Sequence, residues 1–153
     1  MILDAYALVA ALRGEAATEV VRGLLRDRDL HCRLLSTVVA ETVDRVSRLD
    51  HQPAEQVALD LMQLGLEVTP VDGHLGVLAG TLRAEAYHRT RSPLSLADCV
   101  VAAEALRCRD VLVTSDPALL DLVASRGGSY IALPGSDGTV HSPDVLYPGG
   151  PLA

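Results

Sequence analysis

Short apolar segments alternate with longer helical segments along most of the chain, and this alternation limits the folds open to it. Strands are predicted at residues 1–4, 32–35, 66–69, 111–114 and 130–133. Helices are predicted at residues 7–12, 17–27, 36–49, 53–64, 72–89, 96–106 and from 117 to the glycine pair at 127–128. Strands that alternate with helices form a parallel sheet covered on both faces. The expected fold class is therefore α/β, a three-layer α/β/α arrangement around a central, mainly parallel sheet.

Length and composition indicate one domain, and the three cysteines, which form no metal-ligand spacing, indicate a reducing compartment. The chain has 153 residues, of which 49% are hydrophobic, enough for a single core. After residue 133 the sequence turns to Pro, Gly, Ser and Asp, so we expect a domain at 1–133 and an extended or poorly ordered tail at 134–153. No apolar run approaches the roughly 18 residues that span a bilayer, and the first residues lack a basic flank. We expect a soluble, cytoplasmic protein.

The cationic residues exclude several chemistries. All 13 are arginine, because the sequence contains no lysine, and the net charge is −7. A P-loop, a Schiff-base enzyme and a response-regulator receiver domain each need a lysine. The acidic balance also disfavours broad, charge-driven binding to nucleic acid, which requires a basic surface. Any nucleic-acid contact should therefore be local, through a few arginines and a metal ion.

Four acidic residues stand where a predicted strand ends or within the first turns of a predicted helix: Asp4, Glu41, Asp98 and Asp116. Three of them interrupt otherwise apolar sequence. A carboxylate removed from water costs several kcal/mol unless a cation offsets its charge. A shared Mg²⁺ or Mn²⁺ would do so, since both ions prefer oxygen ligands. The carboxyl ends of strands in an open α/β sheet are also where ligands bind.

Helix capping offers a simpler reason for three of these acids. Asp4 can cap the helix that follows the first strand, and Asp116 can cap the helix that starts at Pro117. Asp98 stands three residues after Ser95, the spacing of a capping box. For each of these residues taken alone, a capping role explains the acid as well as a metal-binding role does.

Glu41 and the residues near Asp116 carry similar alternatives. Glu41 can form an ordinary helical ion pair with Arg45, four residues on. Thr114 and Ser115 can hydrogen-bond a phosphate or a bound water, or they can cap the helix after Asp116. Residue type alone leaves both readings open.

The ordered set of acids resembles the four acidic motifs of the PIN domain family, in particular the VapC-like toxin ribonucleases of bacterial and archaeal toxin–antitoxin pairs. The matching segments are residues 1–8, 39–41, 94–98 and 113–116, and the likeness runs from residue 1 to about residue 133. Each motif alone is weak. The set, with its flanking strands and helices, is specific.

The resemblance implies a metal-dependent endoribonuclease, the toxin of a type II toxin–antitoxin system. Asp4, Asp98 and Asp116 would bind Mg²⁺ or Mn²⁺, and Glu41 would complete the catalytic cluster. Water activated by the metal would hydrolyse RNA phosphodiester bonds in single strands or loops, leaving 5′-phosphate and 3′-hydroxyl ends.

The resemblance also implies partners. The apolar helices after residue 5 and at 53–64 would support a homodimer and a groove for a cognate protein antitoxin, although a plain core role explains most of their side chains. Arg89 and Arg91, between two predicted helices, are candidates for phosphate contacts, with a solvated loop charge as the alternative.

One residue departs from the family pattern. The position two after the first acid is usually Ser, Thr or Asn, and here it is Tyr6. This departure implies altered substrate access or reduced activity, and it motivates an alternative function, a catalytically weak PIN-like binding or regulatory module. A haloacid dehalogenase phosphatase is disfavoured, because it needs a second Asp at this position and a catalytic lysine.

Overall fold

Five strands form one sheet in the order β3-β2-β1-β4-β5, and every neighbouring pair is parallel. The computed structural model describes residues 1–90 and 92–143. The strands are β1 (Ile2–Leu3), β2 (Arg33–Leu35), β3 (Glu67–Thr69), β4 (Val111–Thr114) and β5 (Ser129–Ala132). The predicted α/β/α class with a parallel sheet is confirmed.

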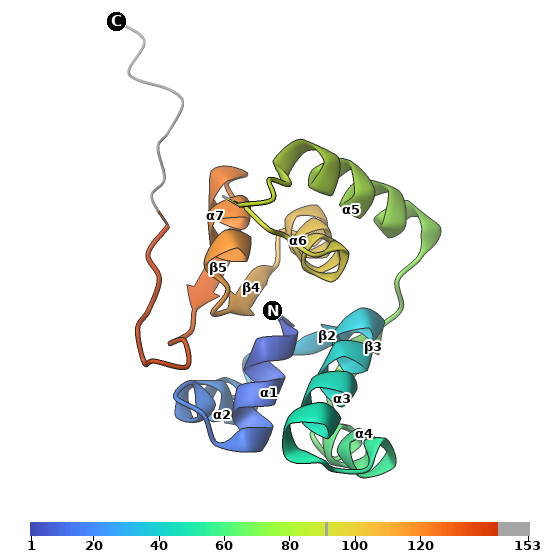
Figure 1. Cartoon of the computed structure of the whole chain (residues 1–153), viewed down its shortest axis with the longest axis vertical. Helices are drawn as coiled ribbons and strands as arrows, with labels where there is room; N and C mark the ends of the chain where they lie inside the picture. Colours follow the sequence, from blue (N-terminus) through green and yellow to red (C-terminus); the bar gives the residue numbers. More distant parts are fainter. Residues whose placement is uncertain (91, 144–153) are drawn as a thin grey trace, which may run out of the picture.

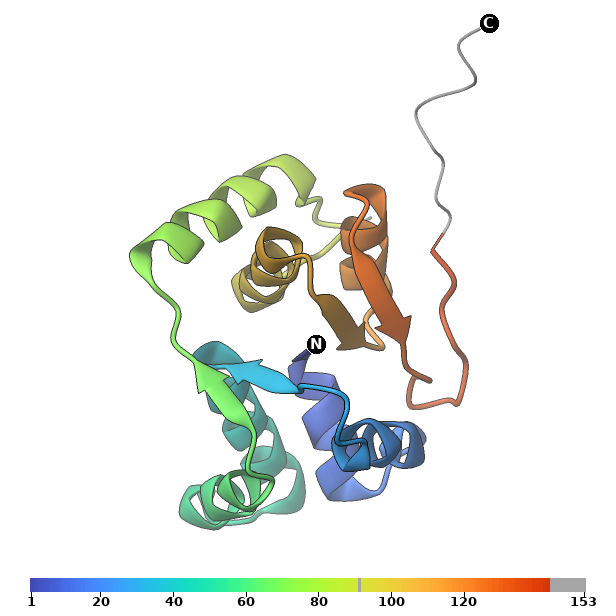
Figure 2. The same cartoon turned by 180° about the vertical axis from the view of Figure 1, so that it is seen from behind.

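Helices cover both faces of this sheet. Those in the described residues are α1 (Ala5–Arg13), α2 (Thr18–Arg26), α3 (Ser36–Asp50), α4 (Ala54–Gln63), α5 (Gly73–Ala86), α6 (Leu96–Cys108) and α7 (Pro117–Ser125). The first four helices lie on one face and the last three on the other (Figures 1 and 2). This follows from the strand order, because parallel crossovers are right-handed and the chain reverses its direction across the sheet after β3.

The reversal creates a switch point between β1 and β4. Chain segments leave the carboxyl ends of these two neighbours toward opposite faces of the sheet, α1 from β1 and α7 from β4 (Figure 1). The register pairs Leu3 with Val113, so Asp4 and Thr114 follow at the same edge. A crevice at such a point is the usual ligand position in open α/β sheets.

Local sequence explains most helix ends, with three corrections. Gly14 closes α1 in the left-handed conformation, at φ 73°, as its position after the apolar run predicts. The prediction that α5 runs to residue 89 is wrong, because the helix ends at Ala86. Pro53 is the N-cap of α4 rather than its first residue. From residue type, Ser36 or Thr37 is the expected N-cap of α3, but the N-cap is Leu35.

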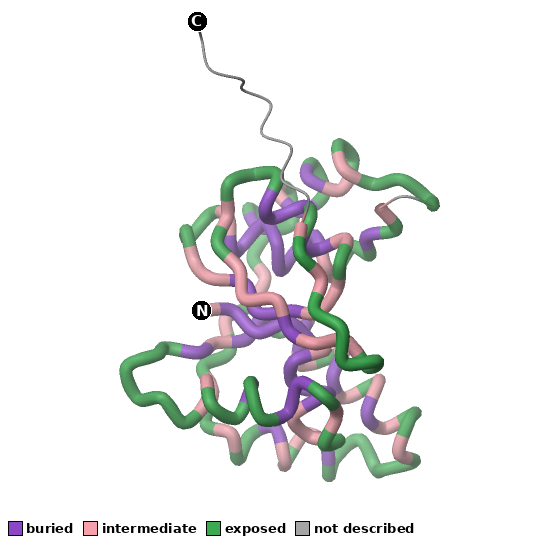
Figure 3. Tube along the Cα trace, turned by 90° about the vertical axis from the view of Figure 1, so that its left-hand side faces the viewer, coloured by how far each residue is buried: buried purple, intermediate pink, exposed green. Residues whose placement is uncertain are grey.

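The core lies between the sheet and both helical layers, as the band of buried residues in Figure 3 shows. One charged residue is part of it. Glu104 on α6 has a side chain only 2% exposed and accepts a hydrogen bond from Arg33 at 2.9 Å and another from Arg107 at 2.9 Å. Arg33 also contacts Asp110 at 3.2 Å, just before β4, which places this ion-pair network at the amino ends of the strands.

Residues 134–143 follow β5 as a hydrogen-bonded turn. Pro134 and Val140 form an antiparallel bridge, and the Gly135 N–H donates to the Thr139 carbonyl at 2.7 Å. The rest of the predicted tail, residues 144–153, lies outside the described residues.

Within residues 1–90 and 92–143, no helix is long and apolar enough to cross a membrane.

Candidate active site

Asp4 is buried at the carboxyl end of β1, with 6% of its surface exposed. Its N–H donates to the Val113 carbonyl at 3.0 Å, which continues the β1–β4 pairing by one residue. Its Oδ1 accepts from the Ala5 N–H at 2.6 Å, so the side chain caps α1 as well. The capping role and the position at the switch point thus belong to one residue.

The Thr114 hydroxyl joins two of the four acids. It donates to Asp4 Oδ2 at 2.8 Å and accepts from the Asp116 N–H at 3.1 Å. Thr114 is fully buried, and its single hydroxyl proton is used at Asp4. The residue therefore sets the orientation of Asp4 and the path of the chain into Asp116.

Asp98 and Asp116 both sit at helix starts, as the capping alternative predicted. Asp98 Oδ2 accepts from the Ser95 N–H at 2.7 Å, and the Asp98 N–H donates back to the Ser95 hydroxyl at 3.0 Å. Asp116 Oδ1 accepts from the N–H groups of Ala118 at 2.8 Å and Leu119 at 3.1 Å. These bonds use one oxygen of each carboxylate and fix its direction.

Glu41 lies on α3, half-buried, and Arg45 Nη1 contacts its Oε1 at 3.3 Å. The ordinary helical ion pair is therefore present. The charge of the same carboxylate also acts on Asp4, where it helps to raise the pKa.

Burial raises the pKa of Asp4 to about 6, against an ordinary value of 3.8. The hydrogen bond from Thr114 opposes this shift, while the charges of Asp98 and Glu41 add to it. The pKa of Glu41 is also raised, first by burial and then by the charge of Asp98. Three carboxylates from α3, α6 and the end of β1 thus share one local field, and Asp116 joins them through Thr114.

Three helices begin next to this group, at Asp4, Ser95 and Asp116. The N-terminal turn of a helix carries partial positive charge from its unpaired N–H groups. These helix starts offset part of the repulsion among the carboxylates, and they leave a net negative site.

The donor chemistry fits a divalent cation. Carboxylate oxygens are the ligands that Mg²⁺ and Mn²⁺ prefer, and the described hydrogen bonds leave one oxygen each of Asp98 and Asp116 without a donor. The pKa of Asp4 is raised first by burial and further by the charges of Asp98 and Glu41, so the hydrogen bonds from Thr114 and Ala5 do not offset the cost of ionising this carboxyl. Among the described residues, however, no three His, Cys, Asp or Glu side chains already form a metal-binding group.

The predicted phosphate contacts lie in three different settings. Ser115 is half-buried between Thr114 and Asp116, and its side chain lowers the pKa of the Tyr6 hydroxyl, against the larger raising effect of burial. Arg89 is exposed in the turn that the His88–Ser92 bridge closes. Arg91 lies outside the described residues.

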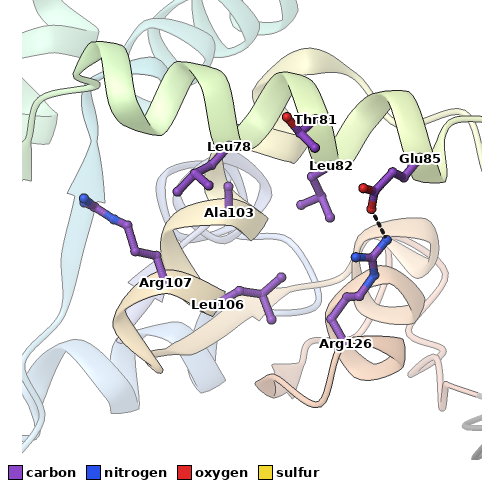
Figure 4. A pocket seen from close by; sticks show the side chains of 8 residues that line it. All are labelled: Leu78, Thr81, Leu82, Glu85, Ala103, Leu106, Arg107 and Arg126. Atoms are coloured by element: carbon purple, nitrogen blue, oxygen red, sulfur yellow. Dashed lines mark hydrogen bonds and ion pairs between the residues drawn. The ribbon is translucent and has the colours of Figure 1, made fainter.

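A hollow of about 500 Å³ lies elsewhere, between α5 and α6 (Figure 4). Its walls are largely apolar, with Leu78, Leu82 and Leu106 among them, and the ion pair of Glu85 with Arg126 at 2.8 Å lies beside it. It includes none of the four acids.

Two features of the site were missed by sequence reasoning. One is the direct bond from Thr114 to Asp4, although a threonine ending one central strand and an aspartate following another could have suggested it. The second is the contact of the Tyr6 hydroxyl, which donates to the Pro134 carbonyl at 3.2 Å and ties α1 to the segment after β5.

Comparison with known proteins decides the family. The PIN domain family model matches residues 1–124, most of the chain. The chain belongs to the PIN domain family. The comparison with curated protein sequences yields no significant match.

Solved structures with the same fold include toxin–antitoxin proteins. FitAB bound to an IR36 DNA fragment is 20% identical, with a TM-score of 0.60 over 85% of this chain and 92% of the other. VapBC2 from Rickettsia felis, bound to a DNA fragment from its promoter, is 22% identical, with a TM-score of 0.56 over 75% and 86%. VapBC-1 from nontypeable Haemophilus influenzae is 18% identical, with a TM-score of 0.58 over 85% and 95%. These likenesses establish the PIN fold across most of the chain.

Proposed function

We propose that this PIN domain is a Mg²⁺- or Mn²⁺-dependent endoribonuclease that hydrolyses RNA phosphodiester bonds. The observation that carries the proposal is the buried Asp4 at the switch point, whose pKa is raised to about 6 within reach of the charges of Asp98 and Glu41. Such a group of acids is costly to the free protein and suits a site built to hold a cation. In this proposal residues 1–133 form the nuclease domain.

Each acid then has a separate role. Asp4, Asp98 and Asp116 hold the cation, directly or through water, and Glu41 completes the cluster. When bound, the ion supplies an activated water and charge stabilisation for the departing oxygen. Thr114 keeps Asp4 turned toward the site through its 2.8 Å bond, and Ser115 hydrogen-bonds a substrate phosphate. Arg89 and Arg91 contribute phosphate contacts farther along the RNA.

We further infer that the protein is the cytoplasmic toxin of a type II pair, inhibited by a cognate antitoxin and assembled as a homodimer. Support comes from the solved structures, one of which is described as a toxin–antitoxin complex from Klebsiella pneumoniae. Exposed apolar residues on α4 fit a protein partner, since Leu59 is 53% and Met62 76% exposed. A mainly apolar hollow of about 310 Å³ lies beside Met62, between α4, α3 and the edge strand β3.

A cleavage assay tests the proposal. The protein, free of antitoxin, is incubated with structured RNA and with Mg²⁺, Mn²⁺ or EDTA. We expect cutting only with metal, and loss of cutting in Asp4→Ala and Asp98→Ala. Asp29→Ala, an exposed acid outside the site, is the matched control and should cut like the parent. Variants of Asp4 and Asp98 that cut as well as the parent would refute the metal-site assignment.

Tyr6 favours a second candidate, a PIN-like binding or regulatory module. Its hydroxyl donates to the Pro134 carbonyl at 3.2 Å, so an aromatic ring stands where the family usually has a small polar residue. Metal binding measured by calorimetry, with no turnover of any RNA, would favour this candidate. Gain of cutting in Tyr6→Ser would identify the ring as the cause.

A further inference from the structure

A hollow of about 480 Å³ with many polar residues in its lining lies next to the start of α7. Ser115 and Pro117 form one wall, and residues between Gly135 and Ser142 form the other. Ser115 and Pro117 are the two chain neighbours of Asp116, one of the candidate metal ligands. The hollow therefore lies at the Asp116 end of the candidate site, and its volume lies within the range of small-molecule sites.

Apart from Ser115, which the proposed function assigns to a substrate phosphate, the lining favours uncharged hydrogen-bonding groups over phosphate. Serine hydroxyls at Ser115, Ser136 and Ser142 can donate or accept. Asp137 is ionised at neutral pH, because hydrogen bonds from Thr139 lower the pKa of its carboxyl. The described lining contains no arginine, and its histidine, His141, is turned toward Asp121 through Nε2. A phosphate would therefore meet the carboxylate of Asp137 without an arginine to offset its charge. Ribose hydroxyls and base N–H groups, which can donate to these oxygens, fit better.

The wall formed by the turn is held in place before any ligand binds. Asp137 Oδ1 accepts from the Thr139 N–H at 2.9 Å and from its hydroxyl at 2.7 Å. The Gly138 N–H donates to the Gly135 carbonyl at 2.9 Å, and Gly138 adopts the left-handed φ of 80° that closes this tight turn.

Two contacts fix the turn to the rest of the domain. Tyr6 on α1 donates to the Pro134 carbonyl at 3.2 Å, at the start of the segment. His141 Nε2 contacts Asp121 on α7 at 2.7 Å, at its end. A loop anchored at both ends loses less entropy when it binds a ligand, so this hollow is preorganised.

We propose that this hollow binds one ribonucleoside of the substrate, next to the scissile phosphate, and reads its 2′-hydroxyl. The assignment rests on the proposed ribonuclease function and adds a specific subsite to it. The 2′-hydroxyl is the group that separates RNA from DNA, and serine and carboxylate oxygens can accept a hydrogen bond from it. Tyr6 acts here as a positioning residue, since it holds the turn rather than the ligand.

Binding of free nucleosides to the intact chain tests the subsite without catalysis. Adenosine, guanosine, cytidine and uridine, and their 2′-deoxy forms, are titrated by NMR in EDTA. We expect millimolar binding of at least one ribonucleoside, with amide shifts at Ser115 and in 136–142, and at least fivefold weaker binding of its deoxy form. Ser136→Trp should fill the hollow and weaken binding at least tenfold, whereas Ser129→Trp, an exposed serine on β5, should leave it unchanged. Absence of binding, equal binding of the deoxy form, or full binding by folded Ser136→Trp would overturn the proposal.

Kinetics separate failure of the subsite from failure of the enzyme. With metal present, Ser136→Trp should raise KM for RNA at least fivefold and leave kcat within twofold. An unchanged KM in an active enzyme overturns the subsite and leaves the ribonuclease function standing. RNA that stays uncut by the parent protein with either metal refutes the ribonuclease function, and with it the place of the hollow beside a scissile bond.

Discussion

Replacing Asp4 by Asn should stabilise the metal-free protein at neutral pH while abolishing its activity. Burial and neighbouring charge raise the pKa of the Asp4 carboxyl from 3.8 to about 6. One pKa unit corresponds to about 1.4 kcal/mol, so ionised Asp4 costs the folded state about 3 kcal/mol at pH 7. An uncharged amide of the same shape does not carry this cost.

The hydrogen bonds at Asp4 reduce the expected gain. The Asn carbonyl oxygen can still accept from the Ala5 N–H, and its amide can donate to the Thr114 oxygen. The Thr114 hydroxyl proton then loses its acceptor, at a cost of about 1 kcal/mol. The net stabilisation is about 2 kcal/mol, equivalent to a Tm increase of about 4–8 °C for a chain of this size.

The pH dependence has a definite sign. Below pH 3.8 Asp4 is protonated in the folded and unfolded states alike, and its charge costs nothing. Between pH 3.8 and about 6 the folded state binds more protons than the unfolded state, so the parent protein loses stability as pH rises. The advantage of Asp4→Asn should therefore be fully present above pH 6 and disappear toward pH 4.

Urea unfolding in EDTA at pH 4, 5, 6 and 7.5 measures this difference. Asp72→Asn is the control of opposite sign, because the Asp72 carboxyl caps α5 at 2.7 Å from the Leu75 N–H and this bond lowers its pKa. That variant should be less stable than the parent at pH 7.5. The reasoning fails if Asp4→Asn is no more stable than the parent at pH 7.5, or if its advantage is the same at pH 4.

Three further predictions concern metal binding, Thr114 and the buried carboxylate of Glu104. In thermal melts, Mn²⁺ at about 100 times its Kd should raise the unfolding free energy of the parent by about 2.7 kcal/mol and leave that of Asp4→Asn unchanged. An equal increase in both proteins would show that the metal binds elsewhere. Thr114→Val should remove the hydrogen bond to Asp4 and raise the pKa of the Asp4 carboxyl further. The acid limb of the pH–kcat profile should therefore move to higher pH. An acid limb that does not move would show that Thr114 does not position Asp4. Glu104→Gln should leave Arg33 and Arg107 without their shared buried carboxylate. In urea unfolding it should destabilise the protein by about 3–5 kcal/mol, with activity retained at low temperature. A loss below about 1 kcal/mol would show that the ion pairs of Glu104 add little to stability.

The sequence predicted the layers of this fold because both periodicities are local. Apolar runs of four residues and helical spacing between them need only neighbouring residues, and they were enough to place Asp4 and Asp116 at strand ends. The order of the strands depends instead on which segments pair across the chain, so local sequence could not place β1 beside β4.

The capping alternatives illustrate a limit of reasoning from single residues. Asp4, Asp98 and Asp116 do cap or start helices, as the simpler alternative stated, and Glu41 does pair with Arg45. A capping bond occupies one oxygen and aims the carboxylate, so the simple role and the candidate metal role are compatible in one residue. The sequence pattern set the capping role against the metal-binding role, because it does not show where the second carboxylate oxygen points.

Contacts between segments far apart in the sequence could not be predicted from the sequence. The hydrogen bond between Thr114 and Asp4 and the contact of Tyr6 with Pro134 each join segments more than 100 positions apart. The end of α5 at Ala86 was also not predicted, because it depends on the bridge between His88 and Ser92, for which the local sequence gives no signal. Sequence reasoning identified Tyr6 as unusual without showing what it touches.

The central place of β1 has a consequence for synthesis of the protein on the ribosome. Ile2 and Leu3 are paired with Leu112 and Val113, so the strand that carries Asp4 acquires its β4 neighbour only after about 110 further residues have been added. Asp98 and Asp116 are also added long after Asp4. A nascent chain that stops before β4 lacks the strand that holds Asp4 in place, so the four carboxylates can come together only after β4 has been made.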